Sequence, residues 1–334
     1  MANFKMVDLL FYNSSIIINS IIICIISTIV NILGFFMILT HSKRDNPTYR
    51  YTLLISQLLL YFGQLYYGIA MIILPLFPFP AAISMGILRF SFSPHYQVGI
   101  YVLFFASFIY SLFAILIVRL RLVVRRQSIF NISDLTYFKI LSISFLLTVV
   151  FTAIIINYLS CSGHETFYFL SLKYPEYRYL MNTPGILIFC NEAYLNIFLV
   201  FCIIAMFLIL LIYILISSVI HYEVKQQMTN MSRTLRNHHD TVLKDSVLQI
   251  IIKISIVVCW PVWLVIDVFM NPDYDSTIIT NITHSLFILS PIPATLVMIY
   301  QHPDYWKCIR KFFGCPDKNA RRSALQKSQT TIGR

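Results

Sequence analysis

The sequence predicts an all-α membrane protein: a bundle of seven transmembrane helices with a short amphipathic cytoplasmic helix after the seventh span. Three observations support this prediction. Seven stretches of about 20 residues run almost without charge, which is the length that a helix needs to cross a hydrocarbon core. The chain is 58% hydrophobic and only 12% charged, far more apolar than a soluble domain. The basic residues gather in the segments between alternate stretches, as in membrane proteins of fixed orientation.

The seven spans follow one another along most of the chain. An unpaired backbone amide costs several kcal/mol in hydrocarbon, so each span must be helical or belong to a closed barrel, and continuous apolar runs exclude the alternating barrel pattern. We place the spans at 16–40, 51–75, 97–118, 140–159, 194–219, 246–270 and 279–300. The chain then divides into an extracellular tail (1–15), a seven-helix domain (16–300), a juxtamembrane helix (301–315) and a basic cytoplasmic tail (316–334).

The basic residues also predict the orientation. Of the 25 Lys and Arg residues, 21 lie in segments that share one side, namely 41–50, 119–139, 221–253 and the region after 300. Because cytoplasmic loops are enriched in Lys and Arg, we expect the amino terminus outside and the carboxyl terminus inside. The net charge of +11 therefore reflects topology and contact with anionic membrane lipid, and it does not indicate nucleic-acid binding.

Several residues are candidates for covalent modification. Cys161 and Cys190 lie at the two ends of the loop that joins the fourth and fifth spans, on the predicted oxidising side, where they would form either a disulfide or two free thiols. Asn13 and Asn281 stand in glycosylation patterns that also arise often by chance. Cys308 and Cys315 follow the last span, where palmitoylation and a plain thiol are the alternatives.

The segment after the seventh span alternates aromatic and basic residues. Trp306, Ile309, Phe312 and Phe313 recur at helical spacing from Pro303, with Lys307, Arg310 and Lys311 between them. This pattern is typical of a short basic helix that lies in the membrane interface, although a basic disordered tail is the alternative.

Prolines should bend two of the spans. Pro261 in the sixth span, and Pro291 and Pro293 in the seventh, each remove a backbone hydrogen bond. Such kinks would favour an outward swing of the inner helix ends, but they are also common in transmembrane helices that do not switch.

Motifs at the ends of the spans add a family resemblance. The second span is followed by Pro75-Leu76-Phe77-Pro78, with Ala81 and Gly86 further on. The third span opens with Ser93, His95 and Gln97. The seventh span contains His284 and ends at His302-Pro303-Asp304-Tyr305. In this order they resemble the nematode serpentine chemoreceptors, particularly classes H and I, which share the plan of G-protein-coupled receptors. The chain departs from rhodopsin-like receptors in having no acidic residue before Arg119-Leu120-Arg121 and in lacking the residue between Trp260 and Pro261.

The resemblance implies a receptor for a small-molecule odorant, or a water-soluble attractant or repellent, in the plasma or sensory ciliary membrane. In that plan the outer helix ends surround one cavity, for which the candidate lining residues are His95, Tyr96, Glu192, Tyr194, Trp260, Trp263, Asp267 and His284. A heterotrimeric G protein would face the basic inner residues Arg119, Arg121, Arg125, Arg126, Arg233 and Arg236. Alternatively, the candidate cavity residues only contact the membrane interface, and the basic inner residues only fix the orientation of the protein in the membrane.

Other functional classes have less support in the sequence. The chain contains no hydrolase, zincin or phosphate-loop motif, so we expect neither an enzyme nor a cofactor or metal. A ligand-gated channel or a transporter of small solutes is the remaining alternative. Transporters usually show paired repeats and midplane charges, which this chain lacks, and insect-type odorant channels have the inverse orientation.

Overall fold

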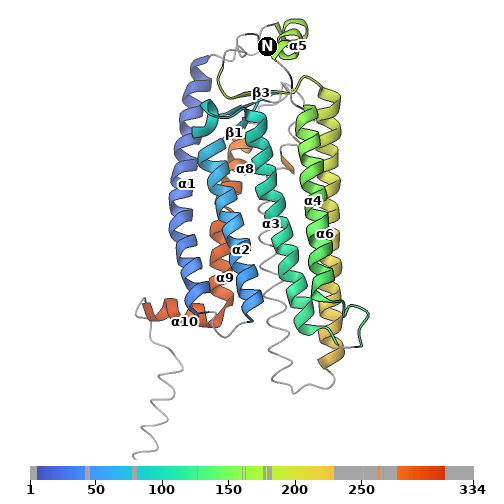
Figure 1. Cartoon of the computed structure of the whole chain (residues 1–334). Helices are drawn as coiled ribbons and strands as arrows, with labels where there is room; N and C mark the ends of the chain where they lie inside the picture. The colour runs from blue at the N-terminus through green and yellow to red at the C-terminus, as the bar shows by residue number, and fades with distance from the viewer. Residues whose placement is uncertain are drawn as a thin grey trace, which may run out of the picture.

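The computed structural model describes residues 6–41, 46–76, 81–125, 127–159, 161, 163–175, 178, 183–228, 251, 262–263, 266 and 277–312. Within these residues the chain forms a bundle of long helices, as Figure 1 shows. The long helices are α1 (Met6–His41), α2 (Pro47–Leu65), α3 (Pro94–Val123), α4 (Asp134–Leu159) and α6 (Glu192–Met228). Shorter elements are the π-helix η1 (Tyr66–Met71), η2 (Ile87–Phe90), α5 (Gly163–Lys173), α8 (Thr277–Leu289), α9 (Pro291–Gln301) and α10 (Pro303–Phe312), with strands β1 (Ile73–Pro75), β2 (Ala81–Ser84) and β3 (Ile186–Ile188).

The helices confirm the predicted fold class, an all-α transmembrane bundle. Five described helices are long and apolar enough to span a membrane, namely Ser15–Thr40, Pro47–Met71, Pro94–Val123, Leu135–Leu159 and Leu195–Gln226. The bent pair Ile279–Leu289 and Pro291–Gln301 supplies one more. Almost all of the expected sixth span, 246–270, lies outside the described residues. Helix α1 begins at Met6, so most of the expected amino-terminal tail continues the first helix.

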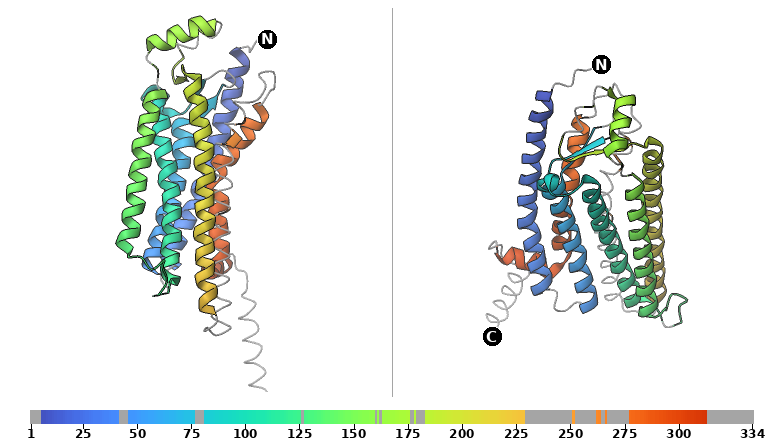
Figure 2. Two further views of the ribbon diagram at one scale, coloured as in Figure 1. Left: turned by 90° about the vertical axis from the view of Figure 1, so that its right-hand side faces the viewer. Right: turned by 45° about the horizontal axis from the view of Figure 1, so that its top comes forward.

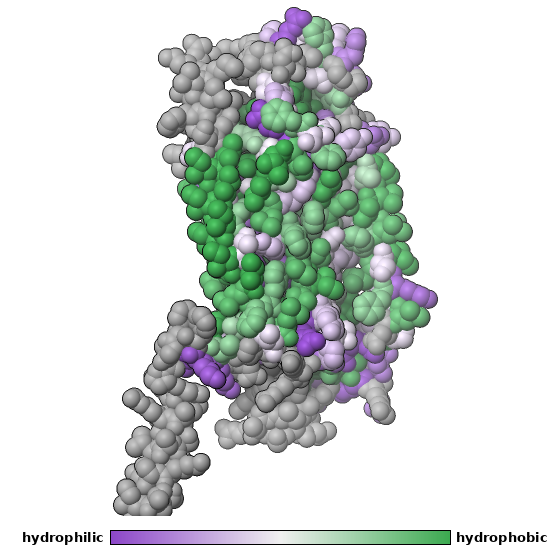
Figure 3. Space-filling view, turned by 60° about the vertical axis from the view of Figure 1, so that its left-hand side comes forward, coloured by the Kyte–Doolittle hydropathy of each residue, from purple (hydrophilic) through white to green (hydrophobic). Residues whose placement is uncertain are grey.

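The surface of the bundle matches a hydrocarbon environment. On α1, the side chains of Ile18, Ile22, Ile25 and Ile29 are all at least half exposed. Figure 3 shows apolar side chains of this kind in a broad band, with polar side chains toward the two ends. In water such a band would be strongly unfavourable, whereas in a bilayer it faces lipid.

The two ends of the bundle differ, and we name them by their contents. The sheet end carries β1, β2 and β3, with α5 lying beyond them, and the opposite α10 end carries α10 running across the bundle (Figures 1 and 2). The strands form an antiparallel sheet in the order β1-β2-β3, with Leu74 opposite Ile83 and Ala82 opposite Leu187. The sequence had predicted helices alone, so this sheet is a difference from the expected fold.

The expected end of the second span at Pro75 was wrong, because the helix stops at Met71. Ile72 adopts a left-handed backbone conformation with φ of 37°, which ends the helix and turns the chain into β1. The chain then returns so closely past η1 that a Cβ on Gly86 would lie 2.2 Å from the carbonyl oxygen of Ala70. Only glycine fits this close approach of two backbones.

A disulfide ties the sheet to the neighbouring helix. The structure joins Cys161, just beyond α4, to Cys190, just beyond β3, with their Cα atoms 6.2 Å apart. The loop between the fourth and fifth spans is thereby closed on itself at the sheet end.

The seventh span is bent and continues into α10. Helices α8 and α9 meet at 42° around Ser290, directly before Pro291, which occupies the first turn of α9. The other expected kink, at Pro261, lies outside the described residues. In α10, Tyr305 is fully buried and Ile309 packs against the bundle core, while Lys307 and Arg310 are exposed, so the expected amphipathic helix is present.

Candidate functional site

An aromatic cluster occupies the bundle core between η1, α3 and α8. The ring centroid of Tyr67 lies 5.1 Å from that of Tyr101 and 5.0 Å from that of Phe287, and Tyr101 lies 6.0 Å from Phe287. These separations are those of favourable aromatic pairs. The cluster therefore joins three elements that are far apart in the sequence.

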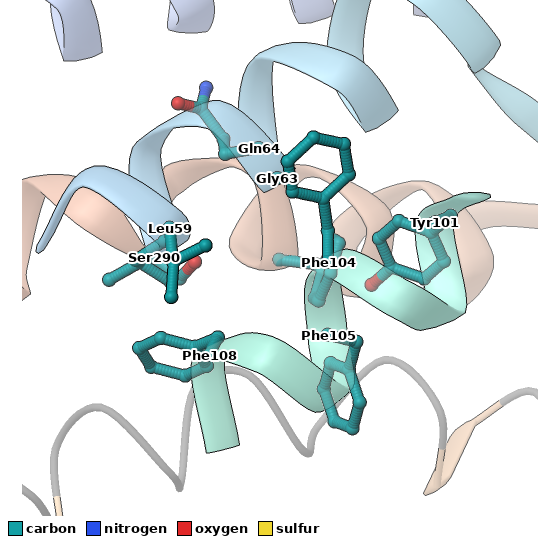
Figure 4. A pocket seen from close by; sticks show the side chains of 10 residues that line it. Leu59, Gly63, Gln64, Tyr101, Phe104, Phe105, Phe108 and Ser290 are labelled. Carbon is teal, nitrogen blue, oxygen red and sulfur yellow. The ribbon is translucent and has the colours of Figure 1, made fainter. Parts of the chain in front are cut away.

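A small cavity adjoins the cluster, shown in Figure 4. It is lined by Leu59, Leu60, Gly63, Gln64, Tyr101, Phe104, Phe105, Phe108, Phe287 and Ser290, from α2, α3 and the junction of α8 with α9. Its volume of about 20 Å³ suffices for a water molecule but falls far short of the several hundred Å³ typical of small-molecule sites. Between α2, α3 and the junction of α8 with α9, the packing therefore leaves no room for a small organic molecule.

The cavity contains one polar group that its surroundings do not satisfy. The hydroxyl oxygen of Tyr101 is buried and has no hydrogen-bond partner among the described residues. Gln64 is engaged elsewhere: its Oε1 accepts a hydrogen bond from Ser27 Oγ at 3.0 Å, and its Nε2 donates to Cys24 Sγ at 3.2 Å. Figure 4 accordingly shows its amide directed away from the aromatic rings.

His284 of α8 contacts Tyr67 of this cluster. Its Nε2 is 3.3 Å from Ser20 Oγ of α1, and its Nδ1 is 3.2 Å from Tyr67 Oη. Since a neutral imidazole donates through one nitrogen and accepts through the other, one hydroxyl accepts and the other donates. The ring thus connects α1 to η1 through the buried core.

Of the other expected ligand-binding residues, none that the structure describes lines the cavity. The Tyr96 side chain is 69% exposed, and half-buried His95 forms a hydrogen bond with the Leu159 backbone. Trp263 Nε1 donates to Thr280 Oγ1 of α8 at 3.0 Å. Glu192 and Tyr194 lie in the first turn of α6 but their side chains are not described, and Trp260 and Asp267 lie outside the described residues.

The buried residue at the start of α3 is Gln97, next to the two residues expected there. Its Oε1 accepts from Ser84 Oγ at 2.6 Å, and its Nε2 donates to the carbonyl oxygens of Leu88 and Phe92 at 3.1 and 2.8 Å. It therefore holds the β1–β2 hairpin and η2 onto α3. From the sequence, Gln97 was expected only as part of a family pattern and not as a structural residue.

A second polar network joins α1, α2 and α9. Gln57 Nε2 donates to Asn31 Oδ1 at 2.8 Å and to Thr295 Oγ1 at 2.5 Å, while Thr295 Oγ1 donates to Asn31 Oδ1 at 2.9 Å. All three residues are completely buried. None of these three neutral residues was among the predicted site residues, which in the membrane spans were chosen for ionisable or aromatic side chains.

At the α10 end, the expected partner-facing arginines contact the protein itself. Arg119 donates to Tyr49 Oη of α2 and lies 4.6 Å from the centroid of that ring, and Arg121 Nη1 donates to the Ile132 carbonyl at 2.7 Å. Arg125 Nε donates to Glu223 Oε2 of α6 at 3.0 Å, and this hydrogen bond raises the pKa of Arg125. Arg126, Arg233 and Arg236 lie outside the described residues.

The candidate modification sites have different surroundings. Cys308 is half-buried against the bundle core, whereas Cys315 lies outside the described residues. Asn281 is within α8, and Thr283 of its glycosylation pattern is buried and hydrogen-bonded to the Ile279 carbonyl. Asn13 lies in α1, with its side chain undescribed. Among the residues that the structure describes, no group of three His, Cys, Asp or Glu could hold a metal ion.

Comparison with known proteins agrees with the fold. The model of the family of serpentine type 7TM GPCR chemoreceptors, Srh, matches residues 13–315, which include all seven expected spans and α10. None of the curated proteins compared matches the chain. The match covers most of the chain, so this multi-pass membrane protein belongs to the Srh family of serpentine chemoreceptors.

Proposed function

We propose that this chemoreceptor detects a small, largely apolar organic molecule in the core between α2, α3 and α8, and that binding activates a heterotrimeric G protein at the α10 end. The observation that carries this proposal is the Tyr101 hydroxyl, which is buried at the cavity without a partner among the described residues. A buried polar group without a hydrogen bond costs about 1–3 kcal/mol, so a ligand that accepts one from Tyr101 recovers that free energy.

The closed cavity explains how binding would change the receptor. A volume of about 20 Å³ cannot hold an organic molecule, so a ligand must displace the side chains of Phe104, Phe105 or Phe108 from between α2 and α3. The ligand then binds an expanded state better than the closed one, and this difference in affinity shifts the equilibrium. Tyr67 and His284 transmit the expansion to α1 through their contacts behind the cavity.

The proposal includes an orientation, with the α10 end in the cytoplasm of a plasma or ciliary membrane. The concentration of 21 of the 25 basic residues on that side supports it. The disulfide between Cys161 and Cys190 at the sheet end also fits an oxidising exterior. A glycosylation tag inserted at the amino terminus tests this orientation, and a tag that remains unmodified there while one at the carboxyl terminus is modified contradicts it.

The arginines at the α10 end would form the G-protein surface after activation. In the closed state Arg119, Arg121 and Arg125 are held by Tyr49, Ile132 and Glu223. Separation of α3 from α6 would release Arg125 and expose Glu223 at the same place. These arginines are therefore engaged within the receptor, and the helix ends would have to move apart before the guanidinium groups could bind a partner.

A Gα reporter assay with a panel of aliphatic ketones, esters and alcohols tests the ligand site. For a ligand that activates the wild type, we expect Tyr101→Phe to raise the half-maximal concentration about 5- to 10-fold, since it removes one hydrogen bond worth about 1–1.4 kcal/mol. Tyr96→Phe is the matched control, because Tyr96 is exposed at the start of the same helix. Equal responses of Tyr101→Phe and wild type at equal surface expression would refute the site, and a ligand-evoked ion current that persists without G proteins would favour a channel.

A further inference from the structure

Ser128 lies at the centre of a small polar clasp at the α10 end. Its Oγ donates a hydrogen bond to Glu223 Oε1 at 2.7 Å, while Arg125 Nε donates to Glu223 Oε2 at 3.0 Å. The Glu223 side chain is 1% exposed, so the carboxylate is buried between these two partners. The Arg125–Glu223–Ser128 clasp therefore joins the loop after α3 to the last turns of α6.

The residues around Ser128 form a recognition pattern for protein kinases. Ser128 follows Arg125-Arg126-Gln127, which places arginines three and two positions before it, and Ile129 follows it. Arginine-directed kinases select such serines through acidic pockets for the two guanidinium groups and an apolar contact for the next residue. Ile129 is 86% exposed and the loop around Ser128 has no helix or strand, as kinase substrates require.

We propose that Ser128 is a phosphorylation site for an arginine-directed kinase and that its phosphate opens the Arg125–Glu223–Ser128 clasp. The Ser128 oxygen forms a bond to the γ-phosphorus of ATP, the bond from that phosphorus to the β–γ bridging oxygen breaks, ADP leaves, and the hydroxyl proton passes to the base of the kinase. In the cell this step rests on the proposed cytoplasmic location of the α10 end, where ATP and the kinase are present.

The geometry of the clasp determines the effect of the phosphate. The hydroxyl that now donates to Glu223 becomes a group of charge about −1.5 to −2, which can no longer donate and which repels the carboxylate. The phosphate oxygens also compete for the Arg125 guanidinium, to which they bind more strongly than a carboxylate does through their higher charge. Glu223 loses both partners, and the end of α6 separates from the loop after α3.

The clasp also predicts that Glu223 protects Ser128 from the kinase. The kinase must draw the loop into its own active site, so the Ser128–Glu223 hydrogen bond and the neighbouring ion pair must first break. Glu223→Gln removes the ion pair and weakens the bond to the serine. Ser128 should therefore be phosphorylated several-fold faster in Glu223→Gln than in the wild type.

The test uses purified full-length receptor in detergent, ATP and the catalytic subunit of cyclic-AMP-dependent protein kinase, with the phosphate located by mass spectrometry. Detergent exposes both ends of the bundle, so the result is independent of the proposed orientation. We expect phosphate on Ser128, none at that position in Ser128→Ala, and faster incorporation in Glu223→Gln. Ser133→Ala is the matched control in the same loop, where no arginine pair precedes the serine. Every variant also carries Ser323→Ala, which removes another serine that follows an arginine pair, Arg321 and Arg322, and could accept phosphate.

Hydrogen–deuterium exchange of the last turns of α6 reports the opening of the clasp. We expect faster exchange around Glu223 after phosphorylation of the wild type and no change after the same treatment of Ser128→Ala. Two results would overturn the proposal: no phosphate on Ser128 in either wild type or Glu223→Gln, or full phosphorylation with unchanged exchange in α6.

Discussion

Exchanging Gly34 for alanine should test how closely α1 and α9 pack. A Cβ at position 34 would lie 2.6 Å from Thr295 Cγ2, closer than two carbon atoms can approach without a shift. Thr295 cannot rotate freely to make room, because its Oγ1 donates to Asn31 and accepts from Gln57. Rotation would break a buried hydrogen bond, and retention of the rotamer would force the helices apart.

The expected cost follows from these two routes. Loss of a hydrogen bond inside a membrane protein costs about 0.6–1.7 kcal/mol, and overpacking of a core costs about 1–3 kcal/mol. We therefore expect Gly34→Ala to destabilise the folded receptor by about 2 kcal/mol. Thr295→Ser removes Cγ2 and keeps the hydroxyl, after which the closest remaining atom, Met298 Cε at 3.4 Å, is in ordinary contact. The double variant should thus be no less stable than Thr295→Ser alone.

Thermal unfolding of the detergent-solubilised receptor measures the effect. At an unfolding entropy of about 2.1 cal/mol/K per residue, a loss of about 2 kcal/mol in this chain of 334 residues corresponds to a decrease in Tm of roughly 3 °C. Gly63→Ala is the matched control, because its Cβ would meet Phe104 Cβ at 3.5 Å, an ordinary contact distance. Unchanged Tm in Gly34→Ala, or additive losses in the double variant with Thr295→Ser, would refute the packing argument.

Three further predictions concern the sheet end and the clasp. Gly86→Ala should prevent correct folding, measured as loss of cell-surface receptor, and no substitution of Ala70 should restore it, because the clash is with backbone atoms. Cys161→Ser and Cys190→Ser should each lower Tm by the same amount, equivalent to about 2–5 kcal/mol, and the double variant should lose no more than either; additive losses would argue against the bond. At equal surface expression, Glu223→Gln should raise Gα reporter activity in the absence of ligand, because it weakens the link between the loop after α3 and α6. Unchanged activity would show that the clasp does not restrain signalling.

The transmembrane helices were predictable because their length is imposed by the membrane. The first span was expected at 16–40 and is found at Ser15–Thr40, since every residue in it must avoid unpaired polar groups in hydrocarbon. The β1–β2 hairpin was not predictable in this way. A short apolar strand beginning at Ile73 has the same hydropathy as a helix end, and the left-handed conformation of Ile72 depends on the packing of η1 and Gly86.

The interior polar residues escaped prediction for a different reason. Ionisable residues are costly in a membrane, which made His284 a candidate, whereas the neutral residues Asn31 and Gln57 were not predicted and Gln97 was expected only as part of a family pattern. A signal was nevertheless present: Gln57 and Gln64 stand seven residues apart in one apolar span, on the same face of a helix. Two amides on one face of a transmembrane helix must find partners on its neighbours, and both do.

Helix α3 provides a mechanical connection between the cavity and the clasp. Tyr101 lines the cavity, and α3 continues from it to Val123, about 33 Å along the helix axis at 1.5 Å per residue. A ligand that pushes the aromatic side chains of α3 away from α2 would therefore tilt a long, rigid helix from one end. A tilt of about 5° moves the far end of such a helix by about 3 Å. A displacement of this size directed away from Glu223 would double the 3.0 Å separation between Arg125 Nε and Glu223 Oε2 and break the ion pair. The clasp is held by short polar contacts, which fail when the atoms separate by a few ångströms. In the proposed mechanism, a change too small to open the whole bundle would therefore suffice to release its α10 end.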